Sequence, residues 1–303
     1  MILEGAAGRA VSSAVERLVY TERVGGSNPS PPTTCGACIP PATSNVMTDA
    51  VFARDGALLI PTDRAAGPWD PGLLHGGAPS CVLAWAAEAY PTEAPMRLTR
   101  LTVDLMRPAP IAPLTIRTEV TRAGRNIQVL ALSIEAHGKE VVRASALKVR
   151  DLETDVPGDV SGPPVEAPAP ETCEPFTNFG DRGFGANFDK RVARGRRGEP
   201  GPTAVWFRPM RALIDGVETS PAMRAAAVAD FGNGVSGILD FTKWTYINAD
   251  LTVNFARAPE GDWVLLDAET WVGRDGRGFA ASRLGDASGY FGRGLQNLVI
   301  APR

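Results

Sequence analysis

Apolar and polar positions alternate along much of the chain, and this pattern predicts β-strands. The alternation runs over residues 101–105 and again over 251–255, and residues 127–134 form a nearly continuous apolar run. Polar, glycine-containing breaks at 124–126 and 136–139 flank that run, as hairpin turns require. The pattern therefore predicts an antiparallel sheet built from hairpins.

Two segments have the period of a helix instead. Ala78-Pro79 opens one of them, and a proline in the first turn of a helix removes no hydrogen bond. Ser220-Pro221 has the form of an N-cap and a first helical residue ahead of residues 223–231. The alanines within 225–229 leave room for a close neighbour. We therefore expect one helix before the strands in each half of the chain.

The two halves repeat each other. Leu101-Thr102-Val103 recurs as Leu251-Thr252-Val253, Arg107 recurs as Arg257, and Arg143 recurs as Arg293. Between the halves, residues 151–175 hold six prolines, seven acidic residues and no Lys or Arg, which is typical of a linker. We expect an α+β fold in which each copy wraps an antiparallel sheet around a long helix, with copies at 47–150 and 176–303 and a linker at 151–175.

Residues 1–46 differ from the rest of the chain. Residues 25–32, Gly-Gly-Ser-Asn-Pro-Ser-Pro-Pro, have turn and linker chemistry without an apolar period, and 26–29 match the translated T-arm of a transfer-RNA gene. We expect this segment to be disordered or read through from upstream of a start at Met47. Cys35 and Cys38 have the spacing of a metal or redox pair, but no second pair completes a site.

Composition excludes several classes of protein. The 303 residues carry 31 Lys+Arg against 34 Asp+Glu and are 44% hydrophobic, which favours packed cores and gives no basic face for nucleic acid. The uncharged stretch 71–87 is broken by proline and glycine, so no membrane span is expected. Four cysteines are too few for a disulfide scaffold. We expect a soluble, cytoplasmic protein.

Polar residues at apolar positions mark a candidate site. Asn248 and Gln296 stand where the first copy has Leu98 and Ala146, and Asp230 follows the apolar run 225–229. A buried amide is unfavourable by about 1–3 kcal/mol unless it is hydrogen-bonded, and a buried carboxylate by more. These three side chains therefore need one another, either as a catalytic group around one water or as a network that only fixes the packing of the copies.

A second candidate precedes the first helix. His75-Gly76-Gly77 would present backbone N–H groups at the positive end of the helix dipole, where glycine lets a substrate oxygen approach the main chain. We expect Gly76 and Gly77 as oxyanion donors, with His75 orienting the loop or polarising a carbonyl. The alternative is that the glycines only form the turn and that His75 is structural.

Three motifs carry a family resemblance. Residues 70–77 (Asp-Pro-Gly-Leu-Leu-His-Gly-Gly), 101–108 and 229–234 resemble double-hotdog acyl-CoA thioesterases of the branch related to acyl-CoA thioesterase II, over roughly 52–300. The resemblance implies a tandem double hotdog and hydrolysis of acyl-CoA to free acid and coenzyme A. It places Asp230, Asn248 and Gln296 around one water, although Asn248 is an amide where that family has a hydroxyl.

The sequence excludes several other functions and leaves two alternatives to thioester hydrolysis. With only two histidines, a His-rich metal site is excluded, and we expect neither a metal nor another cofactor. Gly234-Val235-Ser236-Gly237-Ile238 lacks the last glycine of a nucleophile elbow, and 180–185 lack the spacing of a dinucleotide site. The enzymatic alternative is a hotdog enoyl-CoA hydratase or dehydratase, which pairs a His with an acidic residue that the first helix lacks before Glu88. The other alternative is a non-catalytic acyl-CoA binding module.

Several further features of the sequence allow two interpretations each. The basic run 190–197 either attracts the phosphates of coenzyme A or forms a solvated hairpin. The tryptophans of the second copy are expected in the core or along an acyl tunnel, namely Trp206, Trp244, Trp263 and Trp271. Association into a homo-oligomer is left open, because hotdog pairs commonly associate through sheet edges or faces.

Overall fold

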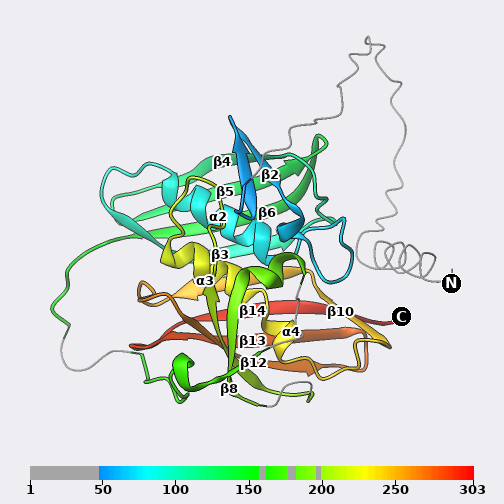
Figure 1. Cartoon of the computed structure of the whole chain (residues 1–303). Coiled ribbons are helices and arrows are strands. Elements are labelled where there is room, and N and C mark those ends of the chain that lie inside the picture. The colour runs from blue at the N-terminus through cyan, green and yellow to red at the C-terminus, as the bar shows by residue number, and fades with distance from the viewer. Residues whose placement is uncertain (1–47, 157–161, 177–181, 196–198) are drawn as a thin grey trace, which may run out of the picture.

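The two repeats join in one antiparallel sheet (Figure 1). The computed structural model describes residues 48–156, 162–176, 182–195 and 199–303. Within them the strand order is β1-β2-β4-β5-β6-β3-β11-β14-β13-β12-β9-β8-β7, and β10 also pairs with β14. The strands are β1 (Phe52–Asp55), β2 (Leu58–Pro61), β3 (Met96–Leu105), β4 (Leu114–Ala123), β5 (Ile127–Ala136), β6 (Lys139–Arg150), β7 (Glu174–Pro175), β8 (Phe188–Arg194), β9 (Thr203–Pro209), β10 (Trp244–Asn248), β11 (Asp250–Phe255), β12 (Val264–Val272), β13 (Arg277–Asp286) and β14 (Gly289–Pro302).

The seam between the repeats lies at β3 and β11. Thr102 pairs with Thr252, Leu101 with Val253 and Val103 with Leu251, so residues at the repeat offset face each other about a local two-fold axis. The two threonine hydroxyl oxygens are 3.3 Å apart. The repeat seen in the sequence is therefore also a repeat in space, and the two copies share one continuous ladder of backbone hydrogen bonds.

The predicted hairpins are confirmed. β4 pairs with β5 across the break at 124–126, and β5 pairs with β6 across the break at 136–139. His137 and Gly138 both have positive φ, 51° and 71°, as the tight turn at that point requires. In the second repeat, β12, β13 and β14 pair in the same way. The result is a large antiparallel sheet with few helices, as the apolar alternation predicts.

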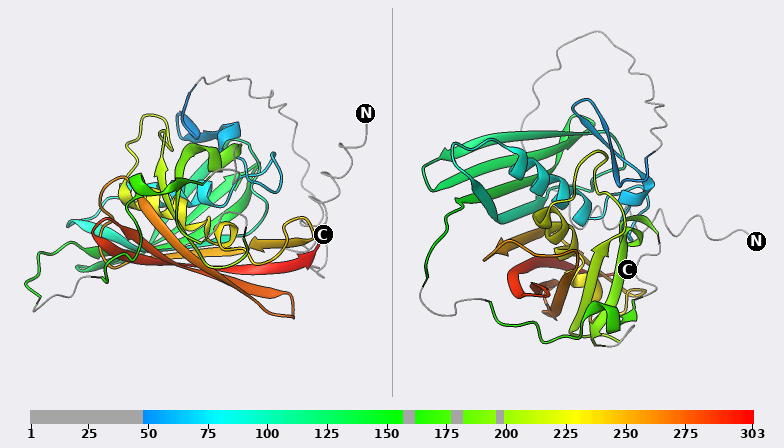
Figure 2. Two further views of the ribbon diagram at one scale, coloured as in Figure 1. Left: turned by 60° about the horizontal axis from the view of Figure 1, so that its bottom comes forward. Right: turned by 60° about the vertical axis from the view of Figure 1, so that its left-hand side comes forward.

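The helices lie against one face of the curved sheet (Figure 2, left). The helices are α2 (Gly77–Ala89), α3 (Pro221–Ala229) and α4 (Gly232–Val235), with 3-10 turns η1 (Asp63–Ala65), η2 (Pro170–Thr172) and η3 (Gly183–Asn187). α2 and α3 pack against each other, because both present small buried side chains such as Ala78 and Ala226. Each helix also contacts the sheet of its own repeat. The apolar faces of the two repeats thus form one continuous core.

The helix of the second repeat is shorter than predicted. Ser220 caps it as expected, its hydroxyl accepting a hydrogen bond from the N–H of Met223 at 3.1 Å. The helix ends at Ala229, however, and Asp230 is its C-cap, so the predicted run to Phe231 is wrong. The chain then turns into α4. The long helix expected in this copy is therefore broken at Asp230, where the carboxylate requires partners that lie outside a helix.

The C-terminal part of the predicted linker packs on the second repeat. β7 pairs with β8, and Cys173 joins a small core with Trp206 and Leu265. Its few apolar residues are enough to attach it to the sheet despite its prolines and acidic residues. The predictions for 1–46, including Cys35 and Cys38, lie outside the described residues.

Two of the four tryptophans expected in the core are exposed, and Trp263 is only partly buried. Trp271 is 59% exposed and Trp244 is 37% exposed, whereas Trp206 is 3% exposed. Trp271 and Trp244 lie on the outer face or at the end of a strand, which the apolar content of the segment could not show. None of the helices in the described part of the chain is long and apolar enough to cross a membrane.

Candidate functional site

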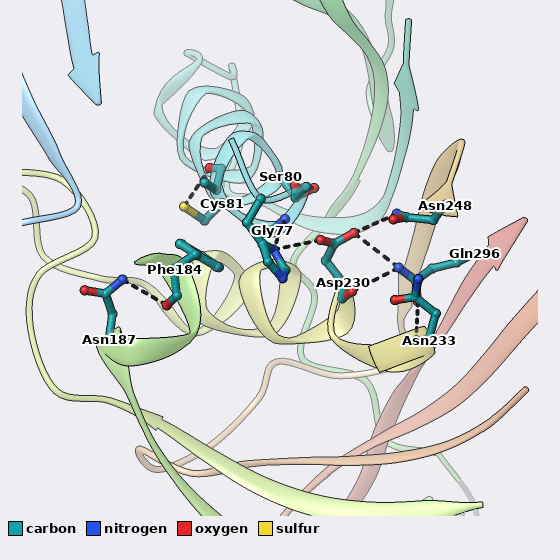
Figure 3. Close-up of polar contacts among 12 residues, drawn as sticks. Gly77, Ser80, Cys81, Phe184, Asn187, Asp230, Asn233, Asn248 and Gln296 are labelled. Atoms are coloured by element: carbon teal, nitrogen blue, oxygen red, sulfur yellow. Dashed lines mark hydrogen bonds and ion pairs between the residues drawn. The ribbon is translucent and has the colours of Figure 1, made fainter. Parts of the chain in front are cut away.

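Asp230 lies at the junction of the two repeats. The residue is 4% exposed, and its side chain points toward Asn248 and Gln296 (Figure 3). Its carboxylate also lies against Gly76, the N-cap of α2. The C-terminus of α3 is an unfavourable place for a carboxylate, because the carbonyl end of a helix dipole is negative. The positive N-terminus of α2 offsets this, since its N-cap Gly76 lies beside the same carboxylate. The packing of α2 on α3 thus places the carboxylate.

Two buried amides hold one oxygen of this carboxylate. Asn248 Nδ2 donates to Asp230 Oδ1 at 2.8 Å, and Gln296 Nε2 donates to the same oxygen at 3.2 Å. Gln296 Nε2 also donates to the backbone oxygen of Asp230 at 3.0 Å. Asn248 is 8% exposed at the end of β10, and Gln296 is 1% exposed on β14. The three polar residues singled out in the sequence are therefore in direct contact.

The arrangement differs in one respect from the expected cage around a water. The amide donors of Asn248 and Gln296 bind the carboxylate itself, so their first effect is to fix its position. Asn248 also lines the main cavity, whereas Gln296 lies behind Asp230 and does not. Gln296 is fixed in turn by the backbone N–H of Asn233, which donates to Oε1 at 3.0 Å.

His75 contacts the other oxygen of Asp230. His75 Nδ1 lies 3.0 Å from Asp230 Oδ2, and the backbone N–H of Gly77 donates to the same nitrogen at 3.0 Å. A ring nitrogen donates when it carries a proton and accepts when it does not. With its proton on Nδ1, His75 donates to Asp230; without it, Nδ1 accepts from Gly77. The position of the ring proton therefore decides which of the two contacts is a hydrogen bond.

The aromatic rings under His75 fix its orientation. Its ring stacks on Phe184 with a centroid separation of 5.0 Å and lies 4.6 Å from the ring of Phe231. Phe207 and Phe188 complete a buried aromatic cluster beneath them. Sequence reasoning did not find this support, because its members come from η3, β8, β9 and the residue after Asp230.

The two candidate oxyanion glycines are not equivalent. A Cβ at Gly76 would lie 2.7 Å from Asp230 Oδ2, so only glycine lets the carboxylate approach this closely. Gly76 lines the cavity, and its N–H makes no hydrogen bond to another residue that the structure describes. The N–H of Gly77 is already donated to His75, and Gly77 does not line the cavity. The role of Gly77 as an oxyanion donor stays a prediction. A Cβ at Gly77 would meet Ala227 O at 2.6 Å, so this glycine also serves the contact between α2 and α3.

A cavity of about 1180 Å³ opens beside Asp230. His75, Gly76 and Leu105 line it from the first repeat, and Phe231, Asn248 and Tyr246 from the second. A site at this seam needs both copies. Burial raises the pKa of the Tyr246 hydroxyl, with a smaller raising effect from Asp240 and an opposing one from Arg303. No group of three or more metal-ligating side chains occurs in the described residues.

The described part of the basic run, residues 190–195, does not line this cavity. Arg191 pairs with Asp189, and Arg194 pairs with Asp267. Residues 196–198 lie outside the described residues, as do the first two of the glycine-containing stretch 180–185. Arg107 and Arg182 line the cavity instead. Trp69 also lines it, whereas Trp206 and Trp263 line a separate cavity of about 390 Å³.

Two family models match the chain. The model of the acyl-CoA thioesterase N-terminal domain matches residues 65–149, and the model of the C-terminal domain of the same family matches residues 167–300. The two matches correspond to the two repeats, and each contains part of the site described above. A search of curated protein sequences gave no match.

Solved structures show the same fold. A proposed thioesterase from Novosphingobium aromaticivorans is 23% identical over 82% of this chain and 98% of its own, with a TM-score of 0.60. A hotdog-fold protein of unknown function from Alicyclobacillus acidocaldarius is 19% identical over 82% and 95%, with a TM-score of 0.65. An acyl-CoA thioesterase II from Mycobacterium marinum is 16% identical over 75% and 88%, with a TM-score of 0.57.

Proposed function

The chain belongs to the acyl-CoA thioesterase family and is a thioesterase, and from this premise we propose that it hydrolyses acyl-CoA with Asp230 as the general base. The proposal includes the architecture: the two repeats are the halves of a tandem double hotdog, at 47–150 and 176–303. The observation that carries the mechanism is a buried carboxylate with one oxygen held by two amides. It lies in a cavity beside Gly76, whose N–H has no partner among the described residues.

The reaction begins with a water in the cavity. Oδ2 of Asp230 takes one proton of the water while its oxygen attacks the thioester carbonyl carbon. Oδ1 is already bound by Asn248 and Gln296, so the carboxylate is held in one orientation and loses little freedom as the reaction proceeds. The carbonyl oxygen of Asn248 is free to accept the second hydrogen of the water, since its amide nitrogen is the atom bonded to Asp230.

Negative charge develops on the carbonyl oxygen as the water attacks. The N–H of Gly76, at the positive end of α2, stabilises this charge. The carbon–sulfur bond then breaks and the electron pair leaves with sulfur. Thiol pKa values near 8.5 make a thiolate a good leaving group, so the step needs no strong general acid. The proton on Asp230 returns to the thiolate or to solvent, which restores the base.

The test replaces the base without changing its shape. In Asp230→Asn the side chain still accepts from Asn248 but takes no proton, and we expect kcat to fall about 10²–10⁴-fold. A panel of acyl-CoA esters with thiol detection measures it. The matched control is Asp250→Asn, the same substitution at a nearby carboxylate that binds Asn297 on the other side of the strand. Wild-type kcat in Asp230→Asn would exclude Asp230 as the base.

One observation favours a second candidate function. A hotdog hydratase or dehydratase needs a His paired with an acid, and α2 supplies no acid in its first turn. Asp230 provides that partner from the other repeat, 3.0 Å from His75. A change in enoyl-CoA absorbance without release of thiol would identify this reaction. Binding of acyl-CoA with neither change would indicate a non-catalytic module.

A further inference from the structure

An aromatic cluster lies at one side of the main cavity, away from Asp230 along β10. Trp69 and Phe241 stack with ring centroids 4.7 Å apart, and Tyr246 meets them edge-on at 5.7 and 6.2 Å. All three residues line the cavity. We call these three residues the aromatic rim. They come from the loop before α2, the loop before β10 and β10 itself, so no single stretch of sequence shows them together.

A cation lies over the aromatic rim. The Arg303 guanidinium is 4.2 Å from the ring centroid of Phe241 and 5.0 Å from that of Trp69. It makes no ion pair with a residue of the described ranges, whereas the neighbouring Asp240 already accepts from Thr242 and lies 3.6 Å from Lys243. Phe241 is 41% exposed and Arg303 is exposed, so the rim is open to a ligand. Ring faces with an uncompensated cation favour a ligand that is both flat and anionic.

Strand β10 connects the Asp230 site to the end of the cavity where Arg303 lies. This strand pairs with β14 (Figure 1). Asn248 lies opposite Leu298 and Trp244 opposite Pro302, and the N–H of Arg303 donates to Lys243 O at 3.0 Å. Asn248 and Lys243, the residue before β10, are five positions apart, a span of about 16 Å along an extended chain. The pantetheine arm of coenzyme A contains about as many backbone bonds as four residues of extended chain, so it covers nearly the same span.

We propose that the aromatic rim and Arg303 bind the nucleotide end of coenzyme A, with adenine on the rings and a phosphate on the guanidinium. The inference rests on the proposed function and says which part of the thioester substrate the rim recognises. A neutral aromatic acyl group would also fit against the rings, but it would cover the Arg303 cation without supplying a counter-charge. Arg107 and Arg182 also line the cavity, but neither lies over an aromatic ring in the described part of the chain.

The first experiment needs no catalysis. Isothermal titration calorimetry with adenosine 3′,5′-bisphosphate measures binding to the wild type and to Arg303→Ala, Phe241→Leu and Arg208→Ala. Arg208 is the matched control, because its guanidinium lies 4.6 Å over Trp263 and neither residue lines the main cavity. We expect about tenfold weaker binding in Arg303→Ala and in Phe241→Leu, the scale of one charge-assisted contact or one stacked base, and no change in Arg208→Ala.

The second experiment compares three substrates that carry the acyl group hydrolysed fastest by the wild type. These are the acyl-CoA, the acyl-3′-dephospho-CoA and the acyl-pantetheine. We expect Arg303→Ala to raise KM for acyl-CoA about tenfold and to leave hydrolysis of acyl-pantetheine unchanged, which also shows that the variant is folded. An effect on acyl-CoA that is absent with the dephospho substrate identifies the 3′-phosphate as the group bound; an equal effect on both identifies the pyrophosphate.

Several outcomes would overturn the inference. In the first, the wild type binds no bisphosphate and hydrolyses acyl-pantetheine as well as acyl-CoA. In the second, Arg182→Ala weakens bisphosphate binding and Arg303→Ala does not. In the third, Arg303→Ala raises KM equally for all three substrates. A loss in Phe241→Leu confined to aromatic acyl groups would assign the rim to the acyl chain instead. Bisphosphate binding without hydrolysis of any thioester would leave the nucleotide site standing and refute the proposed function.

Discussion

Gly76→Ala tests whether close packing of α2 on the Asp230 carboxylate is required for activity. The new Cβ would lie 2.7 Å from Oδ2, 2.8 Å from Oδ1 and 3.0 Å from Cγ of Asp230. Contacts to a carbon are ordinarily 3.5 Å or longer, so the carboxylate must move by about 0.5–1 Å. Asp230 is held by Asn248 and Gln296 at 2.8 and 3.2 Å, and it cannot move that far and keep both bonds.

A displacement of this size in a catalytic group lowers kcat by about 100-fold, and overpacking destabilises a core by about 1–3 kcal/mol. Thiol release from acyl-CoA measures the first effect and urea denaturation the second. Gly124→Ala is the control, because a Cβ there meets its nearest atom at 3.4 Å in a hairpin turn. Gly77→Ala, which meets the backbone of Ala227 and the Phe184 ring, should lose more stability. A folded Gly76→Ala enzyme with wild-type kcat would refute the reasoning.

Three further predictions follow from single contacts. Asn248→Leu, which installs the residue type of the first repeat, removes a hydrogen-bond donor to the Asp230 carboxylate. Urea denaturation should show a loss of about 1–3 kcal/mol in the free energy of unfolding, and thiol-release assays should show a lower kcat. Unchanged values of both would contradict the prediction. In the pair of Arg257 with Asp286, burial alone would raise the pKa of the Asp286 carboxyl, but the hydrogen bonds from Arg257 and nearby backbone N–H groups lower it. The stability that this pair contributes is therefore present above pH ~4 and is lost as pH falls through the folded-state pKa of Asp286. Arg257→Leu should lower the free energy of unfolding at pH 7 by about 3–5 kcal/mol, measured by denaturation. A destabilisation that persists undiminished in acid would argue against this reasoning. Burial raises the pKa of the Glu88 carboxyl, so the stability of the wild type falls as pH rises from the unfolded-state to the folded-state pKa of this group. Glu88→Gln should therefore gain stability relative to the wild type between pH ~4 and ~7, measured by urea denaturation. A stability difference that does not change with pH would contradict the prediction.

The duplication is asymmetric at the site, and this limits the chain to one site of this kind within the described residues. At the offset that relates the repeats, Asn248 corresponds to Leu98 and Gln296 to Ala146, which are 5% and 0% exposed in the core. An apolar pair cannot hold a buried carboxylate, because it offers no hydrogen-bond donor. One copy therefore carries the polar groups and the other copy supplies the glycine turn.

The sequence alone determined the repeat, the antiparallel hairpins, the N-cap at Ser220 and the three polar residues of the second copy. These are readable because local patterns encode them: a period of two, a Ser-Pro pair, and hydrophilic side chains where the other copy is apolar. The contact of Asp230 with Asn248 and Gln296 was predictable for the same reason, since buried polar groups must satisfy one another.

The tertiary structure alone decided how the pieces meet. The pairing of His75 with Asp230, the different environments of Gly76 and Gly77, and the aromatic rim beneath Arg303 each join segments more than fifty residues apart. Such contacts depend on the docking of α2 against α3 and on the strand register along β10 and β14, and neither leaves a periodic signal in the chain. Local sequence therefore identified the polar groups that require partners, and long-range packing decided which atoms face each other.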